Sequence, residues 1–509
     1  MGKYYIGFDC GTQSVKAAIY DEDFKILGIE QISIPIDYPE CEWAQMDAND
    51  YLNNVRECIK RCVEKTNIDP HEVRSICGDG IICGVVGVDQ NGEAITPYIP
   101  YLDNRGKEDA EWINEHCEPY WLKESGNCEV RAFFPVIFMR WLLKNNRNFQ
   151  KDGVKFVHNG PYVLGRLAGL KGKDMFIDYV TMSGSLVGYD VIKKEWSENQ
   201  MNVLDIPMKY LPKVVSPTDI VGQLTKKEAE KMGLVAGIPI VAGAGDTMQS
   251  LLGAGLTEVG MVSDVAGTSA MIAVVVDQMN EKLNANPDLY LSIGSLGDTY
   301  FYWGSVITGG LSLRWFKENV AGRMDGNHFY DEINEGIEST PAGSNGVVYL
   351  PYLQGSCGLL KNSSGCFLNM SMATKQETLY KSVLEAIAYE YKPIMDSVRE
   401  AGIKTGDIVI TEGGSKTKDW NQIKANVLEA DTYTLKTKEG AVRSNVLLGA
   451  YAVGDIKDLK AKVNGLVEIK NRYKVNQKDS ATYQDLYKKR QTLIHKEMLG
   501  GFDVLCKMK

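Results

Sequence analysis

The sequence is poor in the residue patterns that bind metals. Its 509 residues include only five histidines, and its eleven cysteines are scattered without a CxxC pair. Disulfide frameworks and zinc sites both depend on closely spaced cysteines or on cysteine–histidine clusters. We therefore expect reduced, mostly buried thiols, and neither a disulfide framework nor a zinc site.

Long runs of one kind of residue are absent as well. The formal net charge is -10, and no run of lysine or arginine is long enough to follow a nucleic-acid backbone. The N-terminus, MGKYYIGFDCG, reaches a charged turn at Asp9 and lacks the apolar core of a signal peptide or a membrane-spanning segment. We expect a cytoplasmic protein that binds neither nucleic acid nor a membrane.

What the sequence does contain is an ordinary globular composition in a long chain. Hydrophobic residues make up 44% of it and charged residues 24%. A chain of 509 residues exceeds one ordinary core and suggests two domains of roughly 250 residues each. We predict an N-terminal domain at 1–248 and a C-terminal domain at 249–509, with the glycine-rich segment 251–260 as the hinge.

One strand–turn–strand pattern occurs twice. Residues 4–9 read as a short strand, GTQS at 11–14 as a tight turn, 15–21 as a second strand and 24–34 as a third. Residues 262–277 repeat the plan of an apolar strand, a Gly-Thr turn and another apolar strand. Further strands are expected at 73–79, 83–89 and 407–414, and helices at 48–66, 104–116, 306–319, 373–401 and 417–430. This duplicated mixture predicts an α/β protein whose helices cover the sheets.

The repeated turn has the chemistry of a phosphate-binding loop. A glycine directly after a strand lets backbone N–H groups approach an anion, and a neighbouring hydroxyl adds a donor. In the first turn, Gly11, Thr12 and Ser14 fit this role. In the second, Gly267 and Thr268 fit it. Hairpins use these residues widely, so one turn alone is weak evidence, but two turns facing each other across a cleft would hold a polyphosphate from both sides.

Two aspartates stand at strand ends, where a carboxylate needs a positive partner. Asp9 precedes the first turn, and Mg²⁺ carried by a nucleotide and reached through water is its natural partner. Asp246 stands among small residues in AGAGDT, which leave room for a substrate whose hydroxyl proton the carboxylate could accept. For both residues, a turn-capping aspartate is the alternative.

Two further groups of residues are candidates. In ITEGGSKTKDWNQI a strand runs through a double glycine into a helix, so Gly413, Gly414 and Ser415 are nucleotide-side candidates. A Walker A loop is excluded because Ser415 separates Gly414 from the following lysine. Asp103 and Arg105 form either an active-site pair or a structural ion pair that orders the turn around them.

In this order and spacing, several segments resemble the FGGY carbohydrate kinases over nearly the whole chain. They are IGFDCGTQSVKAAIYD at the start, PYLDNR at 100–105, AGAGDT at 242–247, VAGTSA at 265–270, GGLSLRWF at 309–316, VLEAIAY at 383–389 and TEGGSKTKDWNQIKANVL at 411–428. The resemblance implies two actin-like, ribonuclease H-type α/β domains, with ATP and a sugar meeting in the cleft between them.

The resemblance also implies roles by position. Asp9 matches the magnesium-linked aspartate of these kinases, and Asp246 matches their general base. With the candidates above, the ATP side comprises Gly11, Thr12, Ser14, Lys16, Gly267, Thr268, Gly310, Arg314, Gly413, Gly414 and Ser415. The sugar side comprises Ile82, Cys83, Asp103, Asp246 and Thr247.

Within the family, the spelling GTQSVK at 11–16 is most similar to xylulose kinases, which implies a ketopentose substrate. The resemblance departs in one loop, where those kinases have Gln-Met-His-Gly and this chain has Ile81, Ile82, Cys83 and Gly84. A kinase of another polyol or of a deoxy sugar therefore stays open. So does a nucleotide switch of the actin or chaperone type, because fold alone does not fix function. The sequence leaves a homodimer open as well.

Overall fold

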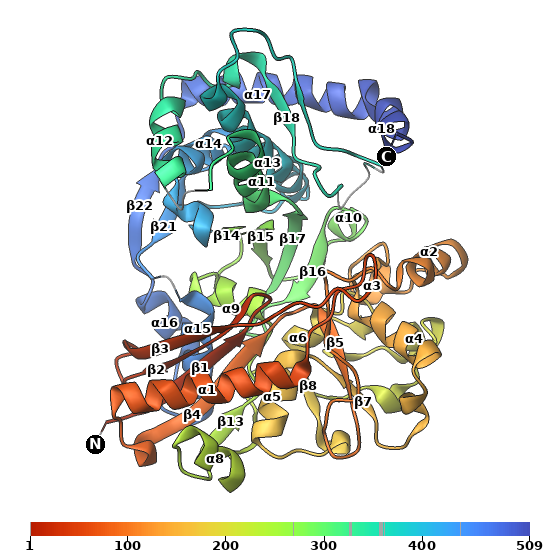
Figure 1. The fold of residues 1–509 in the computed structure, drawn as a ribbon, viewed down its shortest axis with the longest axis vertical. Helices are drawn as coiled ribbons and strands as arrows, with labels where there is room; N and C mark the ends of the chain where they lie inside the picture. The colour runs from red at the N-terminus through yellow and green to blue at the C-terminus, as the bar shows by residue number, and fades with distance from the viewer. Residues whose placement is uncertain are drawn as a thin grey trace.

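The computed structural model describes residues 2–267, 269–324, 328–355, 360, 362–437 and 439–508. Two β-sheets, each with helices around it, are stacked along the long axis of the molecule (Figure 1). Within the described ranges, no helix is both long and apolar enough to cross a membrane. The cysteines in these ranges are all free.

The first sheet is six-stranded and comes from the first half of the chain. In spatial order its strands are β12 (Ile220–Gln223), β13 (Pro239–Val241), β4 (Val73–Gly80), β1 (Tyr4–Cys10), β2 (Ser14–Tyr20) and β3 (Ile26–Ser33). β1, β2 and β3 form an antiparallel meander, because a tight turn can join only antiparallel strands. β4 runs parallel to β1, and β13 runs parallel to β4.

The second sheet is seven-stranded. In spatial order its strands are β16 (Tyr290–Ile293), β17 (Tyr300–Val306), β15 (Ala270–Val276), β14 (Val262–Ala266), β20 (Ile408–Thr411), β21 (Thr432–Leu435) and β22 (Ile469–Tyr473). The order β17-β15-β14-β20-β21 repeats the order β3-β2-β1-β4-β13 of the first sheet, with the same antiparallel and parallel pairs. This repetition confirms the duplicated pattern and the α/β fold class.

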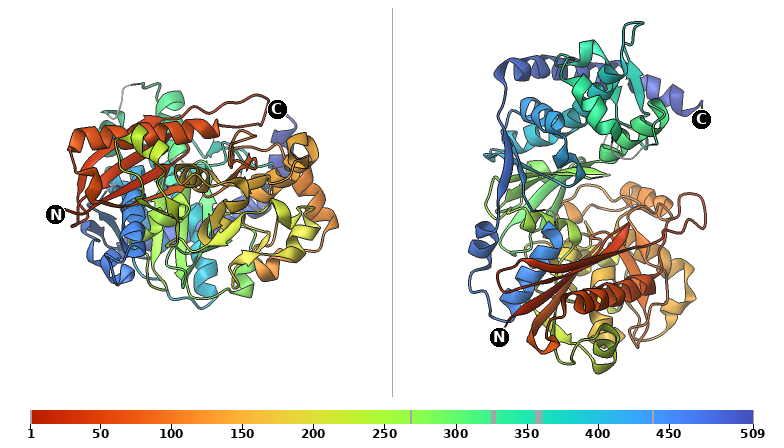
Figure 2. Two further views of the ribbon diagram at one scale, coloured as in Figure 1. Left: turned by 90° about the horizontal axis from the view of Figure 1, so that it is seen from below. Right: turned by 60° about the vertical axis from the view of Figure 1, so that its left-hand side comes forward.

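Helices cover both faces of the first sheet. α1 (Ala48–Thr66) lies on one face, where Ile6 of β1 packs in the same cluster. α15 (Gly440–Ala452) lies on the other face, against Tyr5 and beside α9 (Asp246–Gly253). Successive side chains of a strand point to opposite faces, so these two neighbours meet different helices. The C-terminal part of the chain thus completes the core of the first sheet (Figures 1 and 2).

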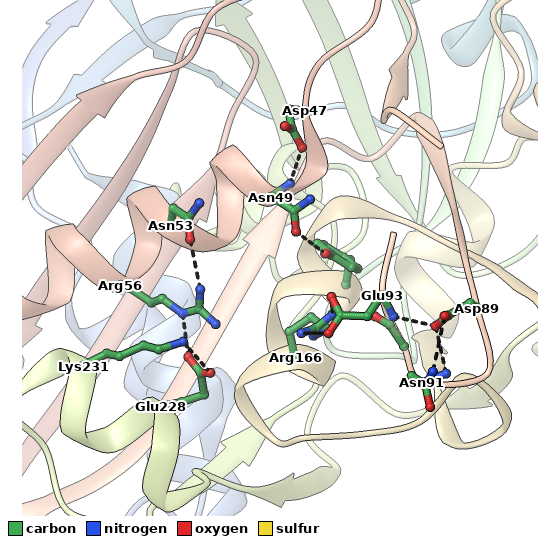
Figure 3. A network of polar contacts seen from close by, with 12 residues as sticks. Asp47, Asn49, Asn53, Arg56, Asp89, Asn91, Glu93, Arg166, Glu228 and Lys231 are labelled. Carbon is green, nitrogen blue, oxygen red and sulfur yellow. Dashed lines mark hydrogen bonds and ion pairs between the residues drawn. The ribbon is translucent and has the colours of Figure 1, made fainter. Parts of the chain in front are cut away.

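Polar side chains hold α1 at its start and along its length (Figure 3). Asp47 caps the helix, since its carboxylate accepts a backbone N–H of the first turn at 2.8 Å. Arg56 Nε donates to Glu228 Oε2 at 2.5 Å, and Lys231 Nζ donates to Glu228 Oε1 at 3.0 Å. Glu228 and Lys231 both belong to α8 (Lys226–Met232), so this helix is fixed against α1.

The remaining elements surround the two sheets. The helices are α2 (Lys107–His116), α3 (Trp121–Glu124), α4 (Pro135–Asn145), α5 (Asn159–Leu167), α6 (Tyr179–Ser183), α7 (Glu198–Val203), α8 (Lys226–Met232), α10 (Glu281–Asn284), α11 (Gly309–Trp315), α12 (His328–Ile337), α13 (Gln376–Glu400), α14 (Lys418–Leu428), α16 (Leu459–Gly465), α17 (Gln477–Thr492) and α18 (Leu499–Cys506). The short strands are β5 (Gly84–Val88), β6 (Ile99–Pro100), β7 (Lys155–Val157), β8 (Phe176–Asp178), β9 (Tyr189–Asp190), β10 (Glu195–Trp196), β11 (Lys213–Val215), β18 (Val348–Leu350) and β19 (Cys366–Leu368). Single turns of 3-10 or π helix are η1 (Pro70–Glu72), η2 (Arg147–Gln150), η3 (Gly172–Asp174), η4 (Met208–Tyr210), η5 (Phe316–Val320), η6 (Ser344–Gly346), η7 (Gly413–Lys416) and η8 (Leu493–Glu497).

The predicted helices are present with shifts of a few residues at their ends. Those expected at 48–66, 104–116, 373–401 and 417–430 are α1, α2, α13 and α14. The helix expected from 306 begins later, at α11, because residue 306 still belongs to β17 and pairs with β15.

Candidate active site

Three aspartates meet where neighbouring parallel strands end. Asp9 on β1 and Asp79 on β4 are in register with each other. Asp246 begins α9, and the preceding Gly245 bridges to Gly80 at the end of β4. The carboxyl ends of parallel strands are where α/β proteins bind ligands. The structure thus brings the two predicted aspartates together, with Asp79, which the sequence analysis missed, on the strand between them.

Asp246 is held by hydrogen bonds to one of its carboxylate oxygens. Oδ1 accepts the Ile82 N–H at 3.1 Å, the Thr247 N–H at 2.6 Å and the Thr247 hydroxyl at 3.2 Å. Burial, followed by the charge of Asp9, raises the pKa of Asp246 to about 7. A carboxylate with this pKa has the properties of a general base at neutral pH.

Asp9 is a buried carboxylate beside a second one. Its Oδ1 is enclosed and faces no N–H or hydroxyl donor in the part of the chain that the structure describes, and the Asp9 carboxylate shares a hydrogen bond with the Asp79 carboxyl. Burial raises the pKa of both Asp9 and Asp79, and the charge of Asp9 raises that of Asp79 further. Asp79 therefore carries the proton of the hydrogen bond that the two carboxyls share. Across the described ranges, no three His, Cys, Asp or Glu side chains converge as direct metal ligands. A cation at the strand end, reached through water, would balance the buried charge of Asp9.

The first glycine turn is closed by its own backbone. The Gly11 N–H donates to the Ser14 carbonyl at 3.1 Å, and Gln31 Nε2 donates to Ser14 Oγ at 2.7 Å. Burial raises the pKa of the neighbouring Tyr101, and the nearby Thr12 side chain opposes this rise. The predicted Gly11, Thr12 and Ser14 therefore lie together directly after the strand that carries the site.

Lys16 lies just past this turn and has a partner from the other end of the chain. Its Nζ is 2.6 Å from Glu439 Oε2, and both side chains are about one quarter exposed, at 23% and 24%. Burial lowers the pKa of Lys16, but the hydrogen bond and the charge of Glu439 raise it. The charges of Asp9 and Glu412 raise it further, so that the pKa lies above its usual value. The ammonium group is therefore surrounded by carboxylates at the edge of the site.

The second glycine turn is joined to the start of α11. The Gly310 N–H donates to the Gly267 carbonyl at 2.9 Å, which brings these two predicted residues together. Thr268 lies outside the described residues. Arg314, farther along α11, is 59% exposed, and its Nε is 3.9 Å from Glu318, so its guanidinium lies on an open face of the helix.

The third glycine turn, formed by Gly413, Gly414 and Ser415, packs against the residue before the second turn. A side-chain carbon added at Gly414 would collide with Ala266 and lie 2.6 Å from the Trp420 ring, so only glycine fits. The Ser415 N–H and hydroxyl both donate to the Glu412 carbonyl, at 3.2 and 2.6 Å. Glu412 has φ 60° and ψ −160°, a conformation otherwise nearly confined to glycine. Gly413 follows this strained residue at the start of η7.

The residues predicted on the sugar side fall into two groups. Ile82 and Cys83 adjoin Asp246 and are 7% and 5% exposed. The Ile82 side chain fills the space between two glycine backbones, one of them Gly245, and Cys83 Sγ donates to the Gly184 carbonyl at 3.1 Å. This loop is therefore apolar at its surface, and its thiol already has an acceptor.

Asp103 belongs to the second group and is enclosed by donors. It accepts the Ala44 N–H at 2.7 Å, the Arg105 N–H at 2.8 Å and the Arg105 guanidinium at 2.8 to 3.0 Å. The guanidinium lies 4.2 Å from the Trp43 ring centre and 5.1 Å from that of Trp141. This geometry favours the structural ion pair of the two alternatives, and a contact of Asp103 with substrate stays a prediction.

Two family models match the chain. The N-terminal domain of the FGGY family of carbohydrate kinases matches residues 4–253, and the C-terminal domain of the same family matches residues 263–453. The xylulose kinase of Bacillus subtilis (strain 168) is 24% identical over 460 residues, 90% of this chain and 90% of that protein. The gluconokinase of the same organism is 25% identical over 478 residues, 91% of this chain and 90% of that protein.

Solved structures match over nearly the full length. The gluconate kinase from Lactobacillus acidophilus has a TM-score of 0.88 at 22% identity and covers 99% of this chain and 100% of its own. The Plasmodium falciparum glycerol kinase with ADP has a TM-score of 0.84 at 17% identity and covers 97% of this chain and 98% of its own. At such identities the structures establish the fold.

Proposed function

The chain belongs to the FGGY family of carbohydrate kinases, and from this premise we propose that it phosphorylates a hydroxyl of a ketopentose such as xylulose. It is an ATP-dependent kinase with an alcohol group as acceptor, and its fold is the two-domain, actin-like α/β fold of the family. ATP and a sugar are its small-molecule partners. The use of Mg²⁺, a cytoplasmic location and a domain boundary near residue 248 are further parts of the proposal.

The proposed mechanism rests on the positions of Asp246 and Asp9, which lie close together at the strand ends. Phosphoryl transfer depends mainly on positioning and on neutralising charge. Asp246, whose pKa is about 7, accepts the proton of the attacking sugar hydroxyl while the new O–P bond forms and ADP leaves. The N–H groups of Ile82 and Thr247 fix one oxygen of this carboxylate and so orient it toward the substrate.

The ATP side of the site would be formed by Asp9 and the glycine turns. Asp9, whose buried charge a cation would balance, would hold the magnesium ion of Mg·ATP through water. When bound, that ion neutralises phosphate charge. The turns at Gly11 and Gly267 would bind phosphate oxygens through N–H groups other than those of the two glycines, which already donate to backbone carbonyls. The open space beside Gly413 would accommodate the nucleoside.

The ketopentose is the finer part of the proposal and rests on the GTQSVK spelling and on the relative from Bacillus subtilis. The Ile82–Cys83 loop would also suit a less polar substrate, because the Cys83 thiol already donates to the Gly184 carbonyl. A deoxy sugar or another polyol is therefore the second candidate.

A coupled assay of ADP release against a panel of sugars and polyols tests the proposal. We expect release to depend on the sugar, xylulose to have the highest kcat/KM, and Asp246→Ala to abolish turnover while retaining ATP binding by calorimetry. A deoxy sugar with the highest kcat/KM would replace xylulose. ATP hydrolysis of equal rate with and without every sugar would favour the nucleotide switch, and native turnover by Asp246→Ala would remove Asp246 from its role.

A further inference from the structure

A buried carboxamide links the segments that carry the two proposed catalytic carboxylates. We propose that Asn445 is a positioning residue of this kinase, which fixes the strand of Asp9 and the helix of Asp246 relative to each other. The proposal rests on the roles proposed above for these aspartates. Asn445 comes from α15, in the C-terminal part of the chain, and is 0% exposed.

The amide nitrogen of Asn445 binds β1 and β4 at one point each. Nδ2 donates to the Phe8 carbonyl at 2.9 Å and to Asp79 Oδ2 at 2.6 Å. Phe8 precedes Asp9 in β1, and Asp79 shares a hydrogen bond with the Asp9 carboxyl. One amide group therefore anchors both the main chain before Asp9 and the side chain beside it.

The amide oxygen of Asn445 binds the helix of the proposed base. Gln249 Nε2 donates to Asn445 Oδ1 at 2.6 Å. Gln249 lies three residues after Asp246 on α9, which is about one helical turn. The same carboxamide is thus bonded to α9 and to the ends of β1 and β4, the elements that hold the three aspartates.

Packing alone does not explain an amide at this place. Val442, Val446 and Leu448 of the same helix are buried and apolar. A buried polar group destabilises a fold unless its hydrogen bonds are made. A leucine would fill the same space without carrying polar atoms that need partners. A leucine could not hold β1 and α9, the elements of Asp9 and Asp246, at a fixed position relative to each other. A misplacement of about 1 Å is enough to lower a rate by about 100-fold.

The test compares variants of the full-length protein. Asn445→Leu removes the amide at similar volume, and we expect kcat to fall about 100-fold while KM for the sugar stays within about twofold. A readout independent of turnover is the affinity for ADP by calorimetry with and without Mg²⁺. The gain in affinity that Mg²⁺ gives should shrink in Asn445→Leu, because Asp9 is no longer held.

Substitutions of Asp79 separate positioning from charge. Asp79→Asn keeps an acceptor for Asn445 and a donor for Asp9, so kcat should stay within about threefold of the native value. Asp79→Leu loses both and should resemble Asn445→Leu. The double variant Asp79→Leu/Asn445→Leu should be no worse than either single variant, because both break the same chain of hydrogen bonds.

Ser444→Ala is the matched control. Ser444 is the buried neighbour of Asn445, and its hydroxyl donates to the Gln249 carbonyl at 2.9 Å without reaching the aspartates. Its kcat should remain native. Gln249→Met, which removes only the donor to Asn445, should lower kcat by about tenfold and decides the question if Asn445→Leu does not fold.

Native kcat in a folded Asn445→Leu, or in Gln249→Met if the former does not fold, would overturn the proposal. An equal loss in Ser444→Ala would do so too, because loosened packing of α9 on α15 would then be the cause. The proposed base is tested separately: if Asp246→Ala is inactive and Asn445→Leu is native, only the role of Asn445 fails.

Discussion

The carboxyl group of Asp246 takes its basicity from its surroundings. Burial is the main cause of its raised pKa of about 7, and the charge of Asp9 adds to it. The donors from Ile82 and Thr247 oppose this shift because they stabilise the charged form. The balance leaves a carboxyl that is close to half ionised at neutral pH, the condition that favours general-base catalysis.

The pH dependence of turnover follows from this pKa. The base acts as a carboxylate, so we expect kcat/KM for the sugar to fall about tenfold for each pH unit below about 7 and to level off above it. A pH profile at low sugar concentration measures this. A profile that stays flat well into the acid range would show that the rate-limiting step does not use a group with this pKa.

Asp246→Asn provides a check that needs no catalysis. Because the pKa of Asp246 is raised on folding, the folded protein holds the proton more tightly than the unfolded one, and this contribution to stability is lost as pH rises through about 7. Asparagine has no proton to release, so the stability of the variant does not change with pH for this reason. The unfolding temperature of Asp246→Asn relative to that of the native protein should therefore increase as pH rises from acid to mildly alkaline.

Among the site residues, the sequence predicts those whose signal comes from residues next to them in the chain. Asp9 and Asp246 could be found because each stands between a strand and a glycine turn. Asp79 also ends a strand, but its closeness to Asp9 depends on the pairing of β1 with β4, which no local pattern specifies. Asn445 could not be found at all, since it is 366 residues away from the Asp79 carboxyl that it binds.

At the scale of elements, a buried ion pair joins β14 to the helices behind it. Asp264 and Lys424 pair at 0% and 1% side-chain exposure, and the Tyr391 hydroxyl donates to Asp264 Oδ1 at 2.7 Å. Lys424 Nζ also lies 3.6 Å from the ring centre of Trp420, which packs on Gly414. The pair therefore supports both the strand before the second turn and the packing of the third.

Breaking this pair should destabilise the protein strongly. Lys424→Met leaves the Asp264 carboxylate buried without its cation, and we expect the free energy of unfolding to fall by about 3 to 5 kcal/mol. Urea unfolding measures the change. The double variant Asp264→Leu/Lys424→Met should recover most of it, because no charge then remains buried. A single variant as stable as the native protein would mean that water reaches Asp264.

Elements were predictable where their signals lie in their own sequence. α1 begins and ends where its apolar spacing and its Asp47 cap indicate. The part that could not be predicted is the partner of each element: α15 follows β21 of the second sheet in sequence, yet it packs on β1 and β4 of the first. That placement depends on which apolar faces remain uncovered after the sheets form.

At the scale of the whole molecule, α15 and the residue before it connect the two halves. Glu439 precedes α15 and lies in the segment between β21 of the second sheet and that helix, and its carboxylate pairs with Lys16 of the first sheet at 2.6 Å. Lys16 is also one of the residues predicted on the ATP side of the site, and its ammonium group could bind a phosphate of ATP. The bound phosphate and Glu439 would then compete for the same ammonium group.

Glu439→Gln tests this competition. Without the carboxylate, the ammonium of Lys16 is free for phosphate, and we expect KM for ATP to fall by about threefold to tenfold at low salt, since a partly exposed ion pair contributes about 1 kcal/mol. The effect should shrink at high ionic strength, where such charges are screened. Glu57→Gln, which breaks the exposed pair of Glu57 with Arg61 on α1, is the control and should leave KM unchanged. A rise in KM for ATP in Glu439→Gln would instead mean that Glu439 orients Lys16 toward the nucleotide.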